Sequence, residues 1–322
     1  MQFAIVTPVK DCVRTIDETV LSVVSQPGTF SIEYHVQDGG SVDGTLEKLD
    51  AWKRLLDSGR FPIGCRAVRF SHDSAPDGGM YAALNRGFSR LSGDVMGWIN
   101  GDDRLQPGAL ATAVAVLTQF PETQWLGGRH AYIDAAGSLV AILDVMPYPR
   151  PLVEAGFYEG RRLVFLQQEG VFWRRALWQK GGSRLAEDLR YAGDFELWCR
   201  FAAAAEYVSV DSVLGVFRVR EGQATNDLAA YYAEVDRLFA GARGERREEL
   251  WKKFQEARRS GKPPVGIDCS GSVVAYDGVT RRWTLTRRSC LDGGPPRPGA
   301  LRWGLRMLDR LWLARQGAQE KG

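Results

Sequence analysis

The sequence contains no long apolar run, no closely spaced cysteine pair and no strong excess of one charge. No segment approaches the roughly 20 apolar residues that a membrane-spanning helix requires. No basic stretch followed by an apolar stretch marks a secretory leader after Met1. The five cysteines are dispersed and form no C-x-x-C pair, which favours free thiols over a disulfide framework or a zinc site. We therefore expect a cytoplasmic protein.

Other absences exclude further classes of protein. A formal net charge of +3 over 322 residues is small, whereas nucleic-acid-binding domains usually carry a clear basic excess, so we expect no nucleic acid partner. The three histidines lie too far apart in the sequence to indicate a zinc site. No G-x-G-x-x-G or Walker loop is present, so dinucleotide-dependent oxidoreductases and P-loop NTPases lack their main signature.

The first half of the chain alternates strand and helix patterns. Short apolar runs predict buried strands at 3–9, 34–39, 65–71 and 95–100. Amphipathic segments between these runs predict helices, and the alternation predicts an α/β fold with helices on both faces of the sheet. The run at 207–220 is expected to form edge strands, and 265–288 a small hairpin with Asp277-Gly278 as its turn. The composition becomes more charged after about Gly222. We therefore expect a large domain at 1–222 and a smaller, mainly helical extension at 223–322.

An acidic pair, Asp102 and Asp103, directly follows the fourth predicted strand. Open α/β sheets bind their ligands at the carboxyl ends of the strands. Adjacent carboxylates repel each other unless a cation lies between them, and hard oxygen ligands suit Mg²⁺ or Mn²⁺, which can bridge to a diphosphate. The alternative is a solvated turn in which an aspartate caps the next helix, and the pair alone does not decide between the two.

Three further motifs contain candidate site residues. Asp38 lies at the end of the second predicted strand and is expected to face a nucleobase, whereas Asp43 is expected to cap the next helix. Asp77 opens a Gly-rich segment that leads into a helix, whose amino end favours anions, and Arg86 would add positive charge near a diphosphate. Asp194 lies among apolar and aromatic residues, which raise the pKa of a carboxyl toward that of a useful base. A helix N-cap is the alternative for Asp194.

Taken in this order, the motifs resemble the family-two glycosyltransferases of the GT-A fold, a bacterial group that builds surface polysaccharides and glycolipids. The matching strings are TPVKDCVRTIDETVLSVVSQ, QDGGSVDGT, DGGMYAALNRGF, GWINGDD and GDFELW. The likeness covers about residues 1–220. It implies a Rossmann-like mixed sheet with a nucleotide-sugar half at about 1–105 and an acceptor half at about 106–222.

The resemblance also implies roles for individual residues. The residues that it assigns to the nucleoside pocket and the donor side are Thr7, Pro8, Asp38, Asp77, Arg86 and Asp102. Asp102 and Asp103 match the family's D-x-D-type site, with Asp103 favoured as the direct metal ligand. Asp194 matches the catalytic base, and Gly193 stands where many members of the family carry a second acid. Gln168 and Glu169 match the stretch that lines the acceptor side.

The function implied is inverting, metal-dependent transfer of a sugar from a nucleoside-diphosphate donor to a saccharide or lipid-linked acceptor. The expected cation is Mn²⁺ or Mg²⁺, and UDP is favoured over dTDP or GDP as the nucleotide. Processive synthases carry a Q-x-x-R-W motif, but Val279 and Gly299 stand three residues before the two Arg-Trp pairs here, so we expect transfer of a single sugar. The alternatives are a catalytically inactive sugar-nucleotide-binding or assembly subunit, and a sugar nucleotidyltransferase.

The segment 297–315 has the pattern of a basic amphipathic helix that contains a tryptophan. Such a helix is typical of elements that lie on a membrane surface. Packing against the catalytic domain or a second copy of the chain explains the same pattern equally well. We therefore keep two expectations for this tail, peripheral contact with the inner face of the membrane and homo-oligomerisation.

Overall fold

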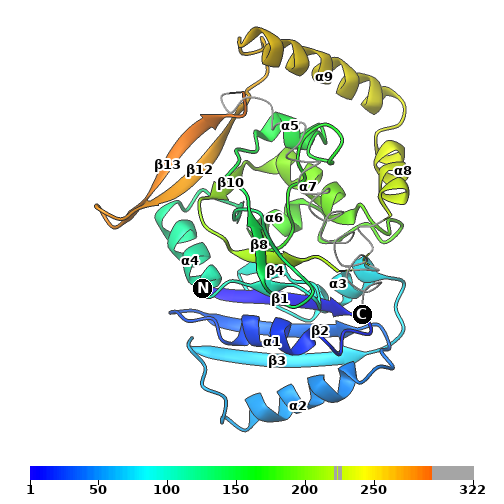
Figure 1. Ribbon diagram of the computed structural model, residues 1–322, viewed down its shortest axis with the longest axis vertical. Coiled ribbons are helices and arrows are strands. Elements are labelled where there is room, and N and C mark those ends of the chain that lie inside the picture. The colour runs from blue at the N-terminus through cyan, green and yellow to red at the C-terminus, as the bar shows by residue number, and fades with distance from the viewer. Residues whose placement is uncertain (221–222, 224–226, 292–322) are drawn as a thin grey trace, which may run out of the picture.

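The structure is a computed structural model that describes residues 1–220, 223 and 227–291. The tail at 297–315, with its predicted membrane or subunit contact, lies outside the described residues. A nine-stranded mixed sheet forms the centre of the molecule, in the order β13-β12-β10-β6-β9-β4-β1-β2-β3 (Figure 1). Among the described residues, no helix combines the length and the apolar character needed to cross a membrane.

The parallel part of this sheet confirms the strands expected in the first half of the chain. It consists of β1 (Gln2–Val9), β2 (Ser31–Asp38), β3 (Ala67–Ser74) and β4 (Val95–Trp98). These strands are neighbours that run in the same direction, so their carboxyl ends meet at one edge. The sheet continues through β9 (Phe172–Arg174), β6 (Trp125–Gly127) and β10 (Tyr207–Val210). Strand β9 runs antiparallel to both of its neighbours.

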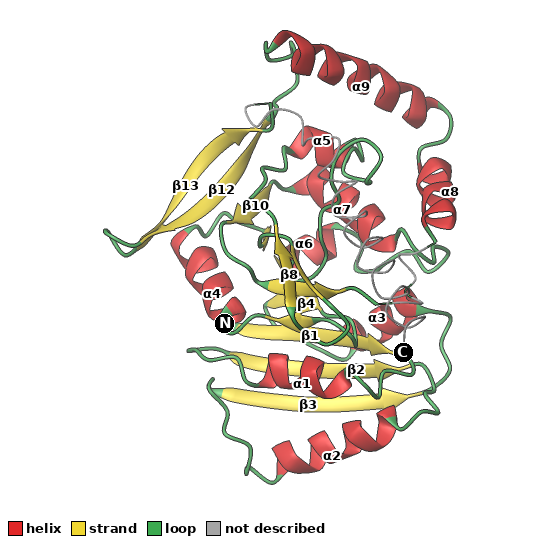
Figure 2. Ribbon diagram, viewed as in Figure 1, coloured by secondary structure: helices red, strands yellow, loops and turns green. Residues whose placement is uncertain are grey.

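Helices cover both faces of the sheet, as expected (Figure 2). Alternate side chains of β1 point to opposite faces, so Phe3 and Ile5 belong to one apolar core and Ala4 and Val6 to another. The first core is completed by α1 (Ile16–Val24), α2 (Thr45–Asp57) and α4 (Ala109–Gln119). The second is completed by α3 (Met80–Ser89), α5 (Arg150–Glu154), α6 (Arg175–Lys180) and α7 (Gly193–Ala204).

A smaller four-stranded sheet lies beside the carboxyl end of β4. Its order is β5 (Arg104–Leu105), β11 (Gly215–Arg218), β7 (Ala131–Ile133) and β8 (Leu139–Ile142). Strand β11 passes very close to the loop before β9, because a Cβ atom on Gly215 would lie only 2.6 Å from the backbone nitrogen of Gly170. Only glycines permit this approach, which brings β11 against the Gln168–Glu169 segment.

The C-terminal part of the described chain comprises α8 (Leu228–Leu238), α9 (Ala242–Ser260) and a hairpin of β12 (Ser270–Asp277) and β13 (Arg282–Ser289). The hairpin was expected, with its turn after Asp277, whose carboxylate accepts from the Val279 backbone N–H at 2.9 Å. Strand β12 pairs in parallel with β10. The extension expected to start at 223 therefore supplies the last two strands of the central sheet in addition to its helices.

Candidate functional site

The acidic pair lies in the loop between β4 and β5, at the carboxyl edge of the central sheet. Asp103 is fully buried, and its carboxylate accepts from the Arg218 backbone N–H at 2.7 Å and from Asn100 Nδ2 at 3.1 Å. Asp102 keeps 8% of its surface exposed and accepts from Arg220 Nε at 2.7 Å. The two carboxylates therefore differ in environment. Asp103 is bonded within the core, whereas Asp102 is partly accessible to solvent.

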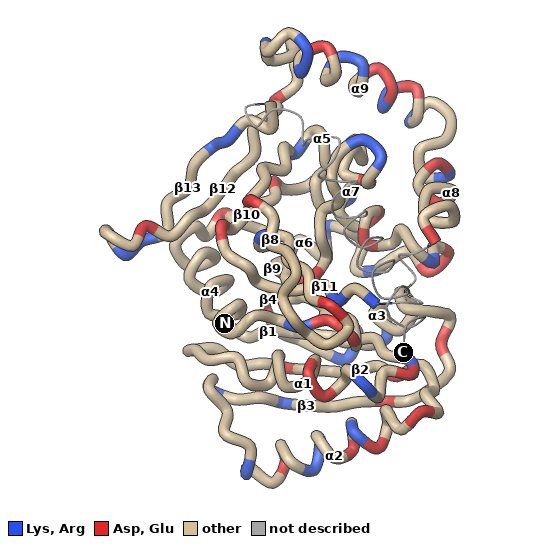
Figure 3. The backbone as a smooth tube through the Cα atoms, viewed as in Figure 1, with Lys and Arg blue, Asp and Glu red and all other residues tan. Residues whose placement is uncertain are grey.

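Arg218, which the sequence analysis did not select, braces this acidic loop. Its side chain is only 1% exposed; Nε donates to the Asp102 carbonyl oxygen at 2.7 Å, and Nη2 donates to Glu18 Oε2 at 2.6 Å. Arg104 also donates to Glu18 Oε2, at 3.1 Å. Figure 3 shows positive and negative residues gathered beside β11. The only sequence signal for Arg218 is a charged residue within the apolar run of β11.

Gln168 and Glu169 belong to the same cluster. Both are buried, and Gln168 Nε2 donates to the Trp98 carbonyl oxygen at 2.7 Å. Asn100 Nδ2 lies 3.4 Å from Gln168 Oε1 and 3.5 Å from Glu169 Oε1. The structure thus places the two predicted acceptor-side residues directly against the acidic loop.

Negative groups are concentrated here. Burial raises the pKa of Asp103 well above its usual range, and the charges of Glu169 and Asp102 raise it further. Burial also raises the pKa of Glu169, to about 7. Like charges in a poorly solvated site disfavour ionisation, and a cation bound among them would restore it.

The residues present fit a hard divalent cation that is coordinated jointly by the protein and by a diphosphate. Among the described residues, no group of three or more His, Cys, Asp or Glu side chains is arranged to hold a metal ion by itself. Asn100 Oδ1 is buried and lacks a hydrogen-bond partner in the described chain. Together with Asp102 and Asp103 it forms a set of oxygen donors, and Mg²⁺-like ions are usually bound by one or two carboxylates, water and substrate phosphates.

The predicted nucleoside residues lie at the ends of β1 and β2. Thr7 and Pro8 are buried, and the Thr7 hydroxyl is 2.9 Å from the Tyr34 hydroxyl in the core. The buried Asp38 carboxylate accepts from the Gly40 and Ser41 backbone N–H groups at 3.1 and 2.9 Å. It also accepts from the Ser74 hydroxyl at 2.6 Å and from the Ser41 hydroxyl. The Asp38 side chain therefore organises its own turn.

The third motif has two candidate residues, Asp77 and Arg86, and the structure brings only Asp77 to the turn at Asp38. Asp77 lies beside the Asp38 turn, because a Cβ atom on Gly39 would be 3.0 Å from its Oδ2 atom. Arg86 lies in the last turn of α3, seven residues after Gly79, which at 1.5 Å per residue is about 10 Å along the helix axis. In the part of the chain that the structure describes, the cationic residues that contact the acidic pair are Arg218 and Arg220.

Asp194 is the second residue of α7. Ala192 occupies the N-cap position, so Asp194 is not the N-cap that was the alternative interpretation. Burial raises the pKa of Asp194 to about 6, and the negative charge of Asp194 contributes, after the larger effect of burial, to the raised pKa of Glu169. The Tyr81 hydroxyl lies 3.4 Å from Asp194 Oδ1. These features suit a general base next to the acidic cluster.

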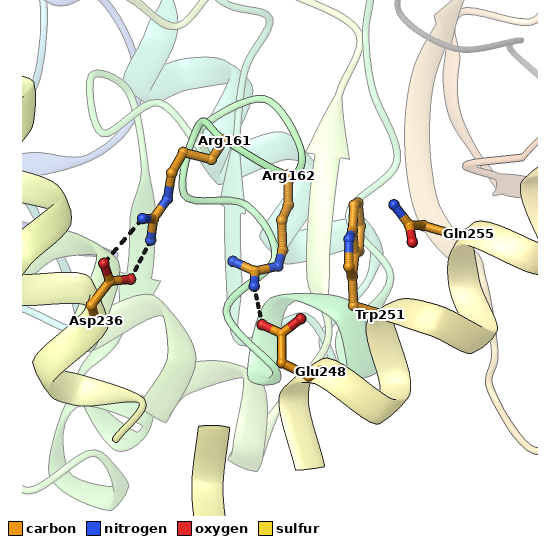
Figure 4. Close-up of a pocket in the computed structure, with 6 residues that line it drawn as sticks. All are labelled: Arg161, Arg162, Asp236, Glu248, Trp251 and Gln255. Carbon is orange, nitrogen blue, oxygen red and sulfur yellow. Dashed lines mark hydrogen bonds and ion pairs between the residues drawn. The ribbon is translucent and has the colours of Figure 1, made fainter. Parts of the chain in front are cut away.

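A pocket of about 410 Å³ lies elsewhere, between the loop after α5 and the helices α8 and α9 (Figure 4). Its lining residues are Arg161, Arg162, Asp236, Glu248, Trp251 and Gln255. Arg161 pairs with Asp236 and Arg162 with Glu248, and both arginines also bond the buried Glu159. These ion pairs tie α8 and α9 to the loop after α5, so the pocket lies where the C-terminal helices contact the rest of the protein. None of the predicted site residues lines it.

Comparison with known proteins gives an independent view of this arrangement. Residues 4–175, more than half of the chain, match the family described as Glycosyl transferase family 2. The uncharacterized glycosyltransferase MT1564 of Mycobacterium tuberculosis is 29% identical over 224 residues, which cover 69% of this chain and 77% of the relative. The succinoglycan biosynthesis protein ExoU of Rhizobium meliloti is 28% identical over 257 residues, which cover 74% of this chain and 70% of ExoU.

Two solved structures share the fold. A fragment of S. aureus TarS, residues 1–349 in complex with UDP-GlcNAc, superposes with a TM-score of 0.53 at 18% identity, over 70% of this chain and 61% of the fragment. The mannosyltransferase PcManGT of Pyrobaculum calidifontis, in complex with GDP-Man and Mn²⁺, superposes with a TM-score of 0.50 at 17% identity, over 73% of this chain and 64% of that chain. This chain therefore spans a little over three fifths of both solved chains.

Proposed function

Because the chain belongs to glycosyl transferase family 2 and is a sugar-transferring enzyme of the GT-A fold, we propose a specific site for its reaction. A nucleoside-diphosphate sugar binds against the loop of Asp102 and Asp103, and Asp194 takes the proton from the attacking acceptor hydroxyl. The observation that carries the proposal is the contact of the Asn100 amide with Asp103 and Glu169, next to Asp102 in the same loop, together with the negative charge of Asp194 acting on Glu169.

Asn100, Asp102 and Asp103 would hold the cation, Mn²⁺ or Mg²⁺. When bound, such an ion neutralises the negative charge that grows on the departing diphosphate. Asp102 is the carboxylate that reaches the surface, and Asp103 lies behind it. The loop is held in place by Arg218, whose contacts with the Asp102 carbonyl and with Glu18 fix the backbone that presents both side chains.

The acceptor side is formed by Asp194, Glu169 and Gln168. A hydroxyl that loses its proton to Asp194 as it attacks the sugar carbon requires no nucleophile from the protein. A single displacement of this kind inverts the anomeric centre, as the family resemblance implies. A pKa of about 6 leaves Asp194 ionised at neutral pH, while it remains more basic than an ordinary aspartate.

The relatives support the substrate class that we propose. ExoU is named for succinoglycan biosynthesis, which supports a saccharide or lipid-linked acceptor in cell-surface polysaccharide synthesis. TarS is described with UDP-GlcNAc and PcManGT with GDP-Man and Mn²⁺, so the nucleotide varies among proteins of this fold. We favour UDP, with dTDP and GDP as the other candidates, and transfer of one sugar at a time at the cytoplasmic side of the membrane.

The first experiment identifies the donor. Thermal unfolding would be followed with UDP-glucose, UDP-GlcNAc, dTDP-glucose and GDP-mannose, each with and without MnCl₂. A ligand that binds only the folded state raises the melting temperature. We expect one nucleotide to do so only when Mn²⁺ is present, and equal shifts with and without Mn²⁺ would contradict the metal-dependent part of the proposal.

The second experiment tests the base. Asp194→Asn should bind the selected donor as the unchanged protein does, but lose release of nucleoside diphosphate with a panel of saccharide acceptors. Asp188→Asn is the control, because Asp188 is an exposed carboxylate that pairs with Arg237. Full transfer by Asp194→Asn would remove Asp194 from the base role. Donor binding without turnover in the unchanged protein would instead favour the inactive subunit.

A further inference from the structure

Glu234 of helix α8 places its carboxylate against the loop at 190–192, which directly precedes α7 and Asp194. Glu234 Oε1 accepts from the Arg190 backbone N–H at 2.7 Å, and Oε2 accepts from those of Tyr191 and Ala192 at 2.9 and 2.8 Å. Ala192 is the N-cap of α7 and has no side chain that can cap a helix. The acceptor for the amides just before α7 therefore comes from a different helix, 42 residues further along the chain.

Helix α8 is itself fixed in position. It shares a small apolar core with α7, formed by Ala192, Phe195, Cys199, Tyr231, Val235 and Phe239. The rings of Phe195 and Phe239 lie 6.0 Å apart. On another face of α8, Asp236 pairs with Arg161 at 2.5 Å. The helix that carries Glu234 is therefore fixed by two contacts, the apolar core shared with α7 and the ion pair with Arg161.

Several titratable groups interact electrostatically with Asp194. They are Tyr81 from α3, Glu169 from the loop before β9, and Tyr231 and Glu234 from α8. The Tyr81 hydroxyl donates to the Tyr191 carbonyl oxygen at 3.0 Å, so a second side chain also holds this loop. The negative charge of Glu234 contributes to the raised pKa of Asp194, after the larger effect of burial.

We propose that Glu234 is a positioning residue for Asp194: its carboxylate holds the backbone of residues 190–192 and so fixes where the Asp194 carboxylate meets the acceptor hydroxyl. The inference rests on the proposed role of Asp194 as base. Glu234 lies beyond residues 4–175, which match the family, and beyond the roughly 1–220 that carry the sequence resemblance. The C-terminal helices would therefore take part in forming the site.

Two variants separate charge from shape. Glu234→Gln keeps the size of the side chain and removes its charge, whereas Glu234→Asp keeps the charge and shortens the reach. The hydrogen-exchange rates of the backbone amides 190–192 report how strongly the Glu234 carboxylate holds them. Carbon-13 NMR titration of labelled aspartates, assigned with Asp194→Asn, reports the pKa of Asp194 without any substrate.

We expect faster exchange at 190–192 in both variants. The pKa of Asp194 should fall in Glu234→Gln, because a nearby negative charge is lost, and should stay close to its original value in Glu234→Asp. With the donor in hand, kcat should fall about tenfold to a hundredfold with little change in donor KM, as expected for a misplaced catalytic group. In Glu234→Gln, the acid limb of the pH–rate profile should also move to lower pH.

Glu249→Gln is the control, since Glu249 is an exposed carboxylate of the neighbouring helix α9 that pairs with Lys253 and not with the 190–192 backbone. It should leave the exchange at 190–192 and the pKa of Asp194 unchanged. Glu234 variants that lower only the melting temperature, with unchanged exchange, pKa and kcat, would overturn the proposal. If Asp194→Asn keeps full transfer, the base assignment fails. If it is inactive while the Glu234 variants behave as the unchanged protein, only the Glu234 proposal fails.

Discussion

Arg220 Nε donates to Asp102 Oδ2 at 2.7 Å, so the more accessible carboxylate of the acidic pair has a guanidinium partner within the chain. A divalent cation that binds Asp102 must displace this guanidinium or share the carboxylate with it. Positive charges at such short range repel each other. Arg220 therefore competes with a metal ion at Asp102, and a bound diphosphate would offer the guanidinium an alternative anionic partner.

Arg220→Gln should tighten the binding of Mn²⁺ to the donor-free protein, on the order of tenfold, because a nearby positive charge disfavours a second cation. Isothermal titration calorimetry with MnCl₂ measures this directly. Arg129→Gln is the control, since Arg129 pairs with Asp211 rather than with the acidic pair. Equal or weaker Mn²⁺ binding by Arg220→Gln would show that the ion pair does not compete with the metal.

The two aspartates of the pair should respond differently to substitution. Asp102→Asn should lose Mn²⁺-dependent donor binding while its melting temperature changes little, because Asp102 reaches the surface. Asp103→Ala should lose the same binding and also lower the free energy of unfolding by roughly 1–3 kcal/mol, because the buried Arg218 backbone N–H and the Asn100 amide lose their acceptor. Thermal unfolding with and without Mn²⁺ and UDP checks both. A variant that keeps the full Mn²⁺-dependent shift does not carry a metal ligand at that position.

The transfer rate should depend on pH through Asp194. A base acts in its deprotonated form, and the pKa of Asp194 is raised to about 6 by burial. The rate should therefore be near its maximum above pH 7 and fall about tenfold per pH unit below pH 6. Initial rates between pH 4.5 and 8 at saturating donor test this. A rate that stays flat down to pH 4.5 would exclude a base of this pKa.

Stability should show the opposite dependence at the same residue. The pKa of Asp194 is about 6 in the folded protein against an ordinary value of 3.8, so protonation favours the folded state. This contribution to stability is fully present below about pH 4 and is lost as the pH rises through 6. Asp194→Asn should therefore be more stable than the unchanged protein at pH 8, by about 3 kcal/mol, and equally stable at pH 4. Urea unfolding at both pH values measures the difference.

Much of the fold could be predicted from the sequence because its signals are local. The apolar run of β1 and the amphipathic segments after it carry their own periodicity, and the hairpin turn after Asp277 is equally local. Pairing between distant strands leaves no such signal. The run at 207–220 was expected to form edge strands, yet β10 lies between β6 and β12, and β11 lies between β5 and β7. The neighbours of these strands come from other parts of the chain, so their positions are set by tertiary packing.

The site shows the same division. The acidic pair, Asp194 and the Gln168–Glu169 segment were selected from strings of adjacent residues. The structure places Gln168 and Glu169 against the acidic loop, and the charge of Asp194 acts on Glu169. Arg218 and Glu234 were missed, since the side chain of each contacts backbone atoms far away in the sequence. Gly193 was noticed only as an absent acid. The structure gives a reason, because a Cβ atom there would lie 2.6 Å from the Tyr81 ring.

The last two strands of the central sheet, β12 and β13, are also the last described elements of the chain. During synthesis, strand β10 must wait for residues 211–269 to emerge before β12 can pair with it. Until then β10 presents unpaired backbone groups that can recruit a strand from another molecule. A ribosome that stops before Ser270 would therefore release a product inclined to aggregate, and we expect the nascent enzyme to depend on chaperones until translation is nearly finished.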